Sequence, residues 1–221
     1  MSRADDHKER RRYATPVRDA RAAATRLRIR AAAETLFLEG GYARTSMSEV
    51  AKRAGVAEKT VYLAFPTKAA LLNEIIVSSI RDADSDHPFR EQMAEALAAP
   101  PAEMLDLFAD INAKLMERTA RVMALGEAAA HADPQLAELR ERGHHAMRSN
   151  FHSIAEALDA HGALSTELDV EAATATIYGI VNESVYLRLV DGFGWTAKHY
   201  RNWLAHVLAQ TLLARPRTRS C

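Results

Sequence analysis

The segment of residues 44–68 constrains the fold most, because it has the pattern of two short helices joined by a tight turn. In its first half, four apolar residues recur at i, i+3, i+4 and i+7: Met47, Val50, Ala51 and Ala54. This spacing gives a helix one apolar face. Gly55 follows directly, and glycine readily adopts the positive φ that a tight turn needs. The first half therefore predicts a helix that ends in a turn at Gly55.

The second half of the segment predicts another short helix. Val61 and Phe65 repeat the i, i+4 spacing, and Pro66 ends the helix. Ala51 is small enough for the two helices to cross closely, while Val56 fills the angle between them. This is the pattern of a helix-turn-helix, whose second helix lies in the major groove of DNA. We therefore expect a DNA-binding protein.

Charge is unevenly distributed along the chain, although its 29 basic and 29 acidic side chains balance overall. Residues 1–80 hold 15 Lys or Arg against 9 Asp or Glu, a net charge of +6. Residues 81–221 hold 14 against 20, a net charge of −6. A basic N-terminal part suits phosphate binding. The acidic remainder would repel DNA, so we expect it to do something else.

Cysteine content and hydropathy bear on the compartment. Cys221 is the single cysteine, so no intramolecular disulfide can form, which suits a reducing cytoplasm. No apolar run approaches the roughly 18 residues of a transmembrane helix. The N-terminus lacks an apolar segment behind its charges, so we expect no secretory signal. The expectation is a soluble, cytoplasmic protein.

The N-terminal part divides into an arm and a small domain. Residues 1–19 are charged and lack apolar periodicity, which predicts a disordered basic arm. Four of its residues are candidate phosphate contacts, although such arms are more often solvated tails: Arg10, Arg11, Arg12 and Arg18. Over residues 20–81 we expect a DNA-binding domain with a helix from about Arg21, the helix pair and the start of a fourth helix. Residues 82–88 are acidic and form the junction.

Residues 89–214 predict a second domain that is helical throughout. No alternating β-branched run appears, so no strand is expected. A helix is expected from Asp169 to Gly192, with apolar residues on two faces, and the last helix carries one clear apolar stripe. A homodimer that uses these last two helices as half of a four-helix bundle explains both faces. Residues 215–221 form a basic tail.

With these motifs, the sequence resembles the tetracycline-repressor (TetR) family of transcription regulators. The resemblance lies in residues 25–80, above all in ThrSerMetSerGluValAlaLysArgAlaGlyVal and ThrValTyrLeuAlaPheProThrLysAlaAlaLeuLeu. It implies an all-α fold with an N-terminal three-helix DNA-binding domain and a C-terminal ligand-binding and dimerisation domain. It also implies a homodimer on a near-palindromic operator, usually a repressor, which a small molecule releases. Ala57 and Leu63-Ala64 depart from the commonest family pattern, in which serine and larger side chains stand there.

Nine residues are candidate DNA contacts: Arg44, Thr45, Ser46, Ala57, Lys59, Thr60, Tyr62, Leu63 and Lys68. Lys68 begins a helix, where its charge opposes the helix dipole, so a bound phosphate would explain it. Lys59 can read guanine and the Thr60 methyl can meet thymine, while Ala57 and Leu63 offer apolar contacts.

The other candidates have phosphate roles with structural alternatives. The Tyr62 hydroxyl can reach a phosphate, or its ring can pack on the surface. Thr45 and Ser46 can donate a hydroxyl or simply cap the helix. Arg44 is a weak phosphate contact or a solvated charge. Since few polar readers are present, DNA shape is expected to supply much of the specificity.

A pocket between the helices of the second domain is the expected sensor. Its candidate lining residues are Met104, Phe108, Met123, Glu127, Phe151, Tyr178, Asn182 and Tyr186. The apolar ones have core packing as the simpler alternative, and Asn182 can instead pair across the dimer interface. His144 and His145 are adjacent and point to different helix faces, so no metal or other cofactor is expected.

Two other classes of function were considered. The sequence has no Gly-rich phosphate loop, nucleophile elbow or zinc-binding HisGluxxHis, so nothing supports an enzyme. A helical adaptor that only binds protein would need neither Lys68 nor the +6 charge. The sequence therefore favours a DNA-binding regulator.

Overall fold

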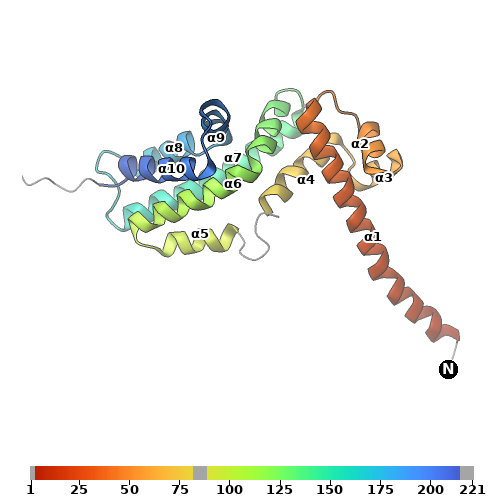
Figure 1. Ribbon diagram of the computed structural model, residues 1–221. Coiled ribbons are helices and arrows are strands. Elements are labelled where there is room, and N and C mark those ends of the chain that lie inside the picture. The colour runs from red at the N-terminus through yellow and green to blue at the C-terminus, as the bar shows by residue number, and fades with distance from the viewer. Residues whose placement is uncertain (1–2, 82–88, 215–221) are drawn as a thin grey trace, which may run out of the picture. The chain divides into compact units, whose positions relative to one another are not determined.

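The computed structural model describes the backbone of residues 3–81 and 89–214, and side chains from Arg18 onward. These residues are helical and contain no named strand, which confirms the all-α prediction (Figure 1). The elements, in order, are α1 (Arg3–Gly40), α2 (Met47–Ala54), α3 (Glu58–Ala64), α4 (Lys68–Arg81), α5 (Phe89–Ala98), α6 (Pro101–Ala130), α7 (Pro134–Ala160), α8 (Val170–Ile180), α9 (Glu183–Leu187), the π-helix η1 (Arg188–Gly192) and α10 (Ala197–Leu212).

The chain forms two compact units that divide inside α4, between Ile75 and Ile76. We call them the N-terminal unit and the C-terminal unit. The junction predicted at 82–88 lies outside the described residues, as does the tail predicted at 215–221.

The helix-turn-helix of the N-terminal unit is held by strong local signals. Ser46 accepts a hydrogen bond from the Glu49 N–H, and the Glu49 carboxylate accepts one from the Ser46 N–H, which is a capping box. Both hydrogen bonds from Ser46, the backbone one first, lower the pKa of Glu49. Gly55 ends α2 with φ 65°, as the sequence predicts. Fully buried apolar residues from all four helices form the core: Ile29, Phe37, Val50, Val61, Leu71 and Leu72.

Helix α1 is longer than expected. The sequence predicts a disordered arm over residues 1–19 and a helix from about Arg21, whereas α1 begins at Arg3. The expectation rested on the missing apolar stripe, but packing is not the only source of helicity. Ala, Arg, Lys and Glu are strong helix formers and fill nine of the 19 positions of this segment.

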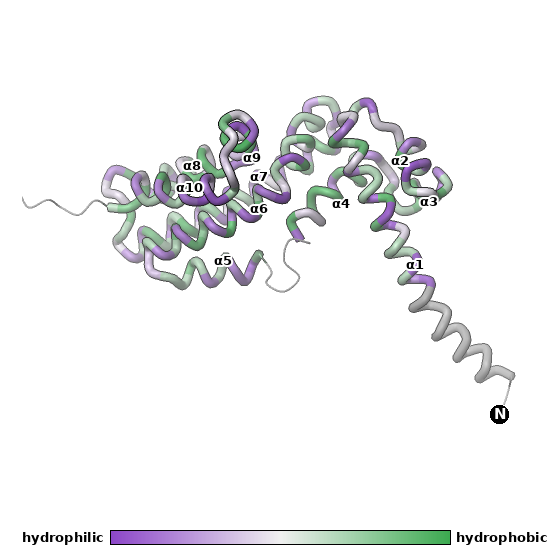
Figure 2. The backbone as a smooth tube through the Cα atoms, viewed as in Figure 1, coloured by the Kyte–Doolittle hydropathy of each residue, from purple (hydrophilic) through white to green (hydrophobic). Residues whose placement is uncertain are grey.

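Helix α6 lies at the centre of the C-terminal unit, in contact with α5, α7, α9 and α10, and α8 packs on α7. Figure 2 shows hydrophobic and hydrophilic residues alternating along these amphipathic helices. Asp133, Asp169 and Thr196 cap α7, α8 and α10 with their side chains. At the end of α4, the Ile76 Cδ1 lies 2.7 Å from where a Cβ on Gly126 would stand. Glycine at this position of α6 therefore allows Ile76 to pack closely.

The helix predicted from Asp169 to Gly192 is interrupted. Helix α8 ends at Ile180, and the chain is extended at Asn182, with φ −151° and ψ 163°. The Asn182 side chain accepts from the Val185 N–H at 2.9 Å and donates to the Gly179 carbonyl at 3.1 Å. Asparagine favours helix caps over helix interiors, because its side chain competes for backbone groups. Apolar spacing alone does not reveal this break.

Among the described residues, no single helix has both the length and the hydropathy needed to cross a membrane. Helices α3 and α4 reach those limits only when taken together, and they are bent by 61° at the break between them.

Candidate nucleic-acid interface and effector region

Helix α3 has an outward face whose side chains do not pack in the core of the N-terminal unit. Val61 is fully buried, whereas Lys59 is exposed and Thr60 is half-buried. Tyr62 is 47% exposed and Leu63 is 77% exposed, which is high for large apolar side chains. Lysine, threonine and leucine together offer a donor and two apolar groups, the chemistry that reads base edges in a major groove. The structure therefore brings the predicted base readers onto one accessible helix.

Contacts from α1 fix the C-terminal end of α3. Arg26 donates a hydrogen bond to the Ala64 carbonyl, and its guanidinium lies 4.2 Å from the centre of the Phe65 ring. Sequence reasoning missed Arg26, because the two partners stand 38 residues apart and no local pattern connects them.

Lys68 has a structural partner set that the sequence did not reveal. Its Nζ lies 2.9 Å from the Tyr42 carbonyl, 3.0 Å from that of Thr45 and 3.4 Å from that of Ala43. It also lies 4.4 Å from the centre of the Tyr42 ring. An ammonium has three donors, and here each faces a carbonyl. The phosphate contact is therefore not needed to explain this lysine, which holds the loop between α1 and α2.

Two other predicted phosphate donors are engaged within the protein. Thr45 is only 5% exposed, and its hydroxyl lies 3.0 Å from the Gly41 carbonyl and 3.2 Å from that of Leu36. The Ser46 hydroxyl donates to the Glu49 carboxylate at 2.8 Å. Capping, the structural alternative for this pair, accounts for the Ser46 hydroxyl, whereas the Thr45 hydroxyl bonds to the Leu36 and Gly41 carbonyls instead.

The remaining predicted contacts are accessible. Arg44 is exposed and donates from Nε to the Gly40 carbonyl at 2.7 Å. Its two Nη groups form no hydrogen bond with a described residue. Ala57 precedes α3 as its N-cap and makes no side-chain cap. Alanine thus provides no capping side chain, and the Thr60 N–H donates instead to the Ala57 carbonyl at 2.8 Å.

The predicted effector residues separate into two clusters in the C-terminal unit. The first is a series of contacts across α6, α7 and α8. Ring centres are 5.8 Å apart for Phe108 and Phe151, and 6.4 Å apart for Phe151 and Tyr178. Tyr178 contacts His144, whose Nε2 lies 2.8 Å from the Glu127 carboxylate. Sequence reasoning did not include His144, although it connects Glu127 to the rings.

Four of the eight predicted lining residues are buried in the core. Met104 and Phe108 are at most 1% exposed, and Phe151 is 4% exposed. Met123 is half-buried and lies 3.3 Å from the Thr119 hydroxyl through its sulfur. Asn182 caps α9, which accounts for a polar residue in an apolar stretch without a ligand.

Tyr186 belongs to the second cluster, with Tyr200 of α10. The two ring centres are 4.8 Å apart. Tyr200 is fully buried, and its hydroxyl has no hydrogen-bond partner among the described residues. Burial raises the pKa of Tyr200, and the neighbouring Tyr186 raises it further. Burial also raises the pKa of Tyr186, with a smaller contribution from Glu117. The sequence places Tyr200 only in an apolar stripe and gives no sign of its unsatisfied hydroxyl.

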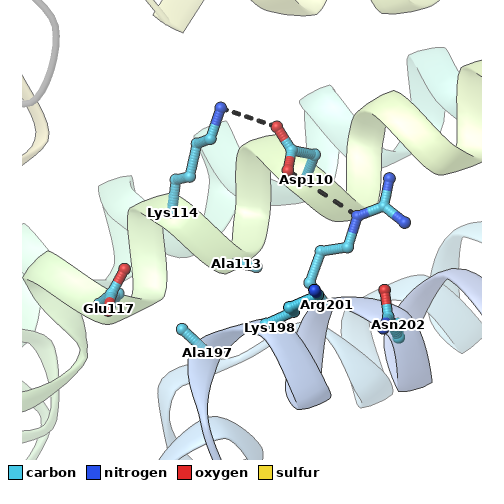
Figure 3. A pocket seen from close by; sticks show the side chains of 8 residues that line it. All are labelled: Asp110, Ala113, Lys114, Glu117, Ala197, Lys198, Arg201 and Asn202. Carbon is cyan, nitrogen blue, oxygen red and sulfur yellow. Dashed lines mark ion pairs between the residues drawn. The ribbon is translucent and has the colours of Figure 1, made fainter.

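A separate surface groove of about 440 Å³ lies between α6 and α10 (Figure 3). Lys114 and Arg201 pair with Asp110 there, at 2.8 Å and 3.8 Å. The groove is lined by Asp110, Ala113, Lys114, Glu117, Ala197, Lys198, Arg201 and Asn202. None of the predicted effector residues is among them. Within the described ranges, no group of three His, Cys, Asp or Glu side chains is placed to hold a metal ion.

An exposed reading helix on a helix-turn-helix, followed by a larger helical unit, defines a helix-turn-helix DNA-binding regulator. The family model of bacterial regulatory proteins of the tetR family matches residues 29–75. The HTH-type transcriptional regulator ArpR of Pseudomonas putida is 29% identical over 163 residues, which cover 72% of this chain and 77% of ArpR.

Solved structures agree with this class at the level of the fold. NalD, the secondary repressor of the MexAB-OprM multidrug efflux pump in Pseudomonas aeruginosa, superposes with a TM-score of 0.69 at 22% identity. The match covers 88% of this chain and 98% of NalD. A transcriptional regulator from Saccharomonospora viridis in complex with choline also gives 0.69, at 18% identity over 87% of this chain and all of that one.

Residues 29–75 therefore form a TetR-family DNA-binding domain, in a chain that is similar to transcriptional regulators over most of its length. The prediction of the family from the sequence is thereby confirmed. Members of this family are transcription factors and not enzymes. A DNA-binding regulator is therefore favoured over the two alternative functions, an enzyme and a protein-binding adaptor.

Proposed function

We propose that the chain is a repressor that binds a near-palindromic operator as a homodimer and leaves it when a small molecule binds the C-terminal unit. The outward face of α3 carries this proposal, because Lys59 and Leu63 are exposed and Thr60 is half-buried on a helix that is anchored at its C-terminal end. NalD, whose fold is similar, is a repressor, which is consistent with this function. Such a protein would work in the cytoplasm, where the DNA is.

The homodimer is proposed from the surface of the last helices. Tyr200, Leu204 and Leu208 face the core of the C-terminal unit, and Trp203 and Val207 form a second, half-buried stripe on α10. A second copy that covers this stripe would remove the apolar surface from water. Two copies would place two α3 helices on two half-sites, which a palindromic operator requires.

The effector is proposed to bind among the aromatic residues of the C-terminal unit. Phe108, Phe151 and Tyr178 provide rings, and the Glu127–His144 pair provides charge. The Tyr200 hydroxyl would gain a hydrogen bond from an effector that carries an acceptor. The choline complex of a fold relative is consistent with a small molecule held by aromatic and acidic groups.

Footprinting on DNA upstream of the chain's own gene tests this function. We expect two protected half-sites related by a two-fold axis and about one or two helical turns apart. Choline serves as the first effector probe, followed by a panel of aromatic and cationic small molecules. Protection without symmetry would contradict the homodimer, and a footprint that survives the whole panel would contradict effector release.

A further inference from the structure

Three exposed arginines form a stripe on α1 that runs along both sides of Arg26, the residue that contacts the end of α3. They are Arg18, Arg21 and Arg28. At 100° per residue, they fall within roughly 80° of the helix circumference. None of them pairs with an acidic side chain among the described residues, and Asp19 is the only acidic residue between positions 18 and 30. We call these three residues the arginine stripe.

Helix α1 carries this stripe past the reading helix. Arg26 fixes α1 against Ala64 and Phe65 at the end of α3, and α1 continues beyond α2 and α3 towards its N-terminus (Figure 1). With a rise of 1.5 Å per residue, Arg18 lies about 12 Å along the axis from Arg26. The major groove is about 12 Å wide and is bordered by phosphates. The stripe therefore extends along α1, from the contact with α3, over a length comparable to the width of the groove.

We propose that the arginine stripe binds phosphates that flank the bases read by α3 and so extends the operator contact beyond the helix-turn-helix. This inference rests on the proposed DNA binding. Arginine guanidinium groups suit phosphate oxygens in charge and geometry. In the sequence, Arg11 and Arg10 precede Arg18 by seven and eight residues, two helical turns, so the basic spacing continues towards the N-terminus.

An anionic membrane is a less suitable partner for the same charge. Helices that lie on membranes carry large apolar residues opposite their cations. On this segment of α1, residues 22–24 are three alanines and Leu27 is a single exposed large apolar residue, which together would insert little apolar surface. DNA needs no such face, because phosphate contacts alone provide the affinity.

The test compares the wild type with the triple variant R18A/R21A/R28A by fluorescence anisotropy. The probes are the footprinted operator duplex, the same duplex lengthened by about ten base pairs at each end, and a random duplex of the longer length. The matched control is R118A/R142A/R148A, which removes three exposed arginines from the C-terminal unit. Circular dichroism checks helicity, and R18K/R21K/R28K keeps the charge.

We expect the wild type to bind the lengthened operator more tightly than the short one, and the triple variant to lose this gain. The slope of log affinity against log salt should fall by about 0.9 for each phosphate contact removed, up to about 2.7 per protomer. The lysine variant should restore most of the slope, and the control should match the wild type.

Equal affinity and slope in the wild type and the alanine variant would overturn the inference while leaving the repressor function intact. A wild type that does not distinguish operator from random DNA would instead count against the proposed function. Phosphatidylglycerol vesicles form the last arm. If the alanine variant loses vesicle binding but keeps all DNA binding, the stripe serves a membrane and the inference is wrong.

Discussion

The two units differ in one polar group, because a buried hydroxyl of the C-terminal unit lacks a partner among the described residues. In the N-terminal unit, Lys68 directs its three donors to three carbonyls, and the Thr45 hydroxyl also has carbonyl partners. In the C-terminal unit, the buried Tyr200 hydroxyl has no partner among the described residues. Unsatisfied buried groups cost free energy, and they persist where a structure must be able to change or bind.

The backbone shows the same contrast. In the N-terminal unit, a capping box begins α2, and Gly55 in the left-handed region ends it. In the C-terminal unit, a helical stretch breaks at Asn182 and continues through a π-helix, a form that often occurs at functional sites. The comparison is consistent with the proposed functions, DNA reading by the first unit and effector binding by the second.

Lys68→Met should produce the largest effect, because it removes the charge that holds three carbonyls of the α1–α2 loop. Loss of these hydrogen bonds should destabilise the N-terminal unit by roughly 2–3 kcal/mol. Thermal unfolding and operator affinity measure it, with Lys198→Met, an exposed lysine of the groove, as the control. A normal melting curve with lost DNA affinity would show instead that Lys68 acts on phosphate.

The double variant Lys59→Ala and Thr60→Ala should reduce operator affinity by roughly ten- to a hundred-fold, or about 1.4–2.8 kcal/mol in total, because each of these contacts is weaker than a bidentate base contact. Affinity for random DNA should change much less, and the melting temperature should not change. Competition between the two duplexes measures this difference. If both affinities stay as in the wild type, these residues do not read DNA.

Ser46→Ala should destabilise the N-terminal unit by about 1 kcal/mol, since it removes the side-chain cap of α2. The effect also gives a pH dependence. The pKa of Glu49 is lowered in the folded state, so the capping box contributes stability above the ordinary pKa of 4.5 and loses it as pH falls through the lowered value. Urea unfolding at pH 7 and pH 3 checks both points, and the variant should respond less to acid.

Tyr200→Phe should have the smallest effect on stability at pH 7, and any change should make the variant more stable than the wild type. The hydroxyl is buried without a partner, so its removal should leave stability unchanged or raise it by up to about 1 kcal/mol. Leu204→Ala on the same helix should cost roughly 2–5 kcal/mol and serves as the contrast. Denaturant unfolding compares the two, and a destabilised Tyr200→Phe protein would mean that the hydroxyl has a partner in solution.

Tyr200→Phe should also change how stability depends on pH in alkaline solution. The folded pKa of Tyr200 is raised above its ordinary value of 10.0. The folded chain therefore keeps this proton while the unfolded chain releases it, and stability falls as pH rises above about 10. The fall should be less steep in Tyr200→Phe, although Tyr186, whose pKa is also raised, should retain part of it.

The sequence predicts the helix-turn-helix well because its determinants are local. The apolar spacing of Met47 to Ala54, the turn at Gly55 and the stop at Pro66 all act within a few residues. The partners of Lys68 lie up to 26 residues away, and that of Arg26 lies 38 residues away. Such contacts depend on how the helices pack, so periodicity predicts the faces of helices but not the atoms that meet there.

The effector region shows the same limit. Phe108, Phe151 and Tyr178 do come together, because each stands on an inward stripe of its own helix. Tyr186 lies in another cluster, with Tyr200. Asn182 caps α9, a separate helix that the apolar spacing does not predict. The unsatisfied Tyr200 hydroxyl depends on what surrounds it from other helices, which no window of sequence contains.

Titration of the purified protein against upstream DNA and against random DNA, at several salt concentrations, tests the central claim most directly. The account predicts tight, selective binding to the upstream duplex, with affinity that falls steeply as salt rises. Absence of binding to either duplex, even at low salt, would contradict it.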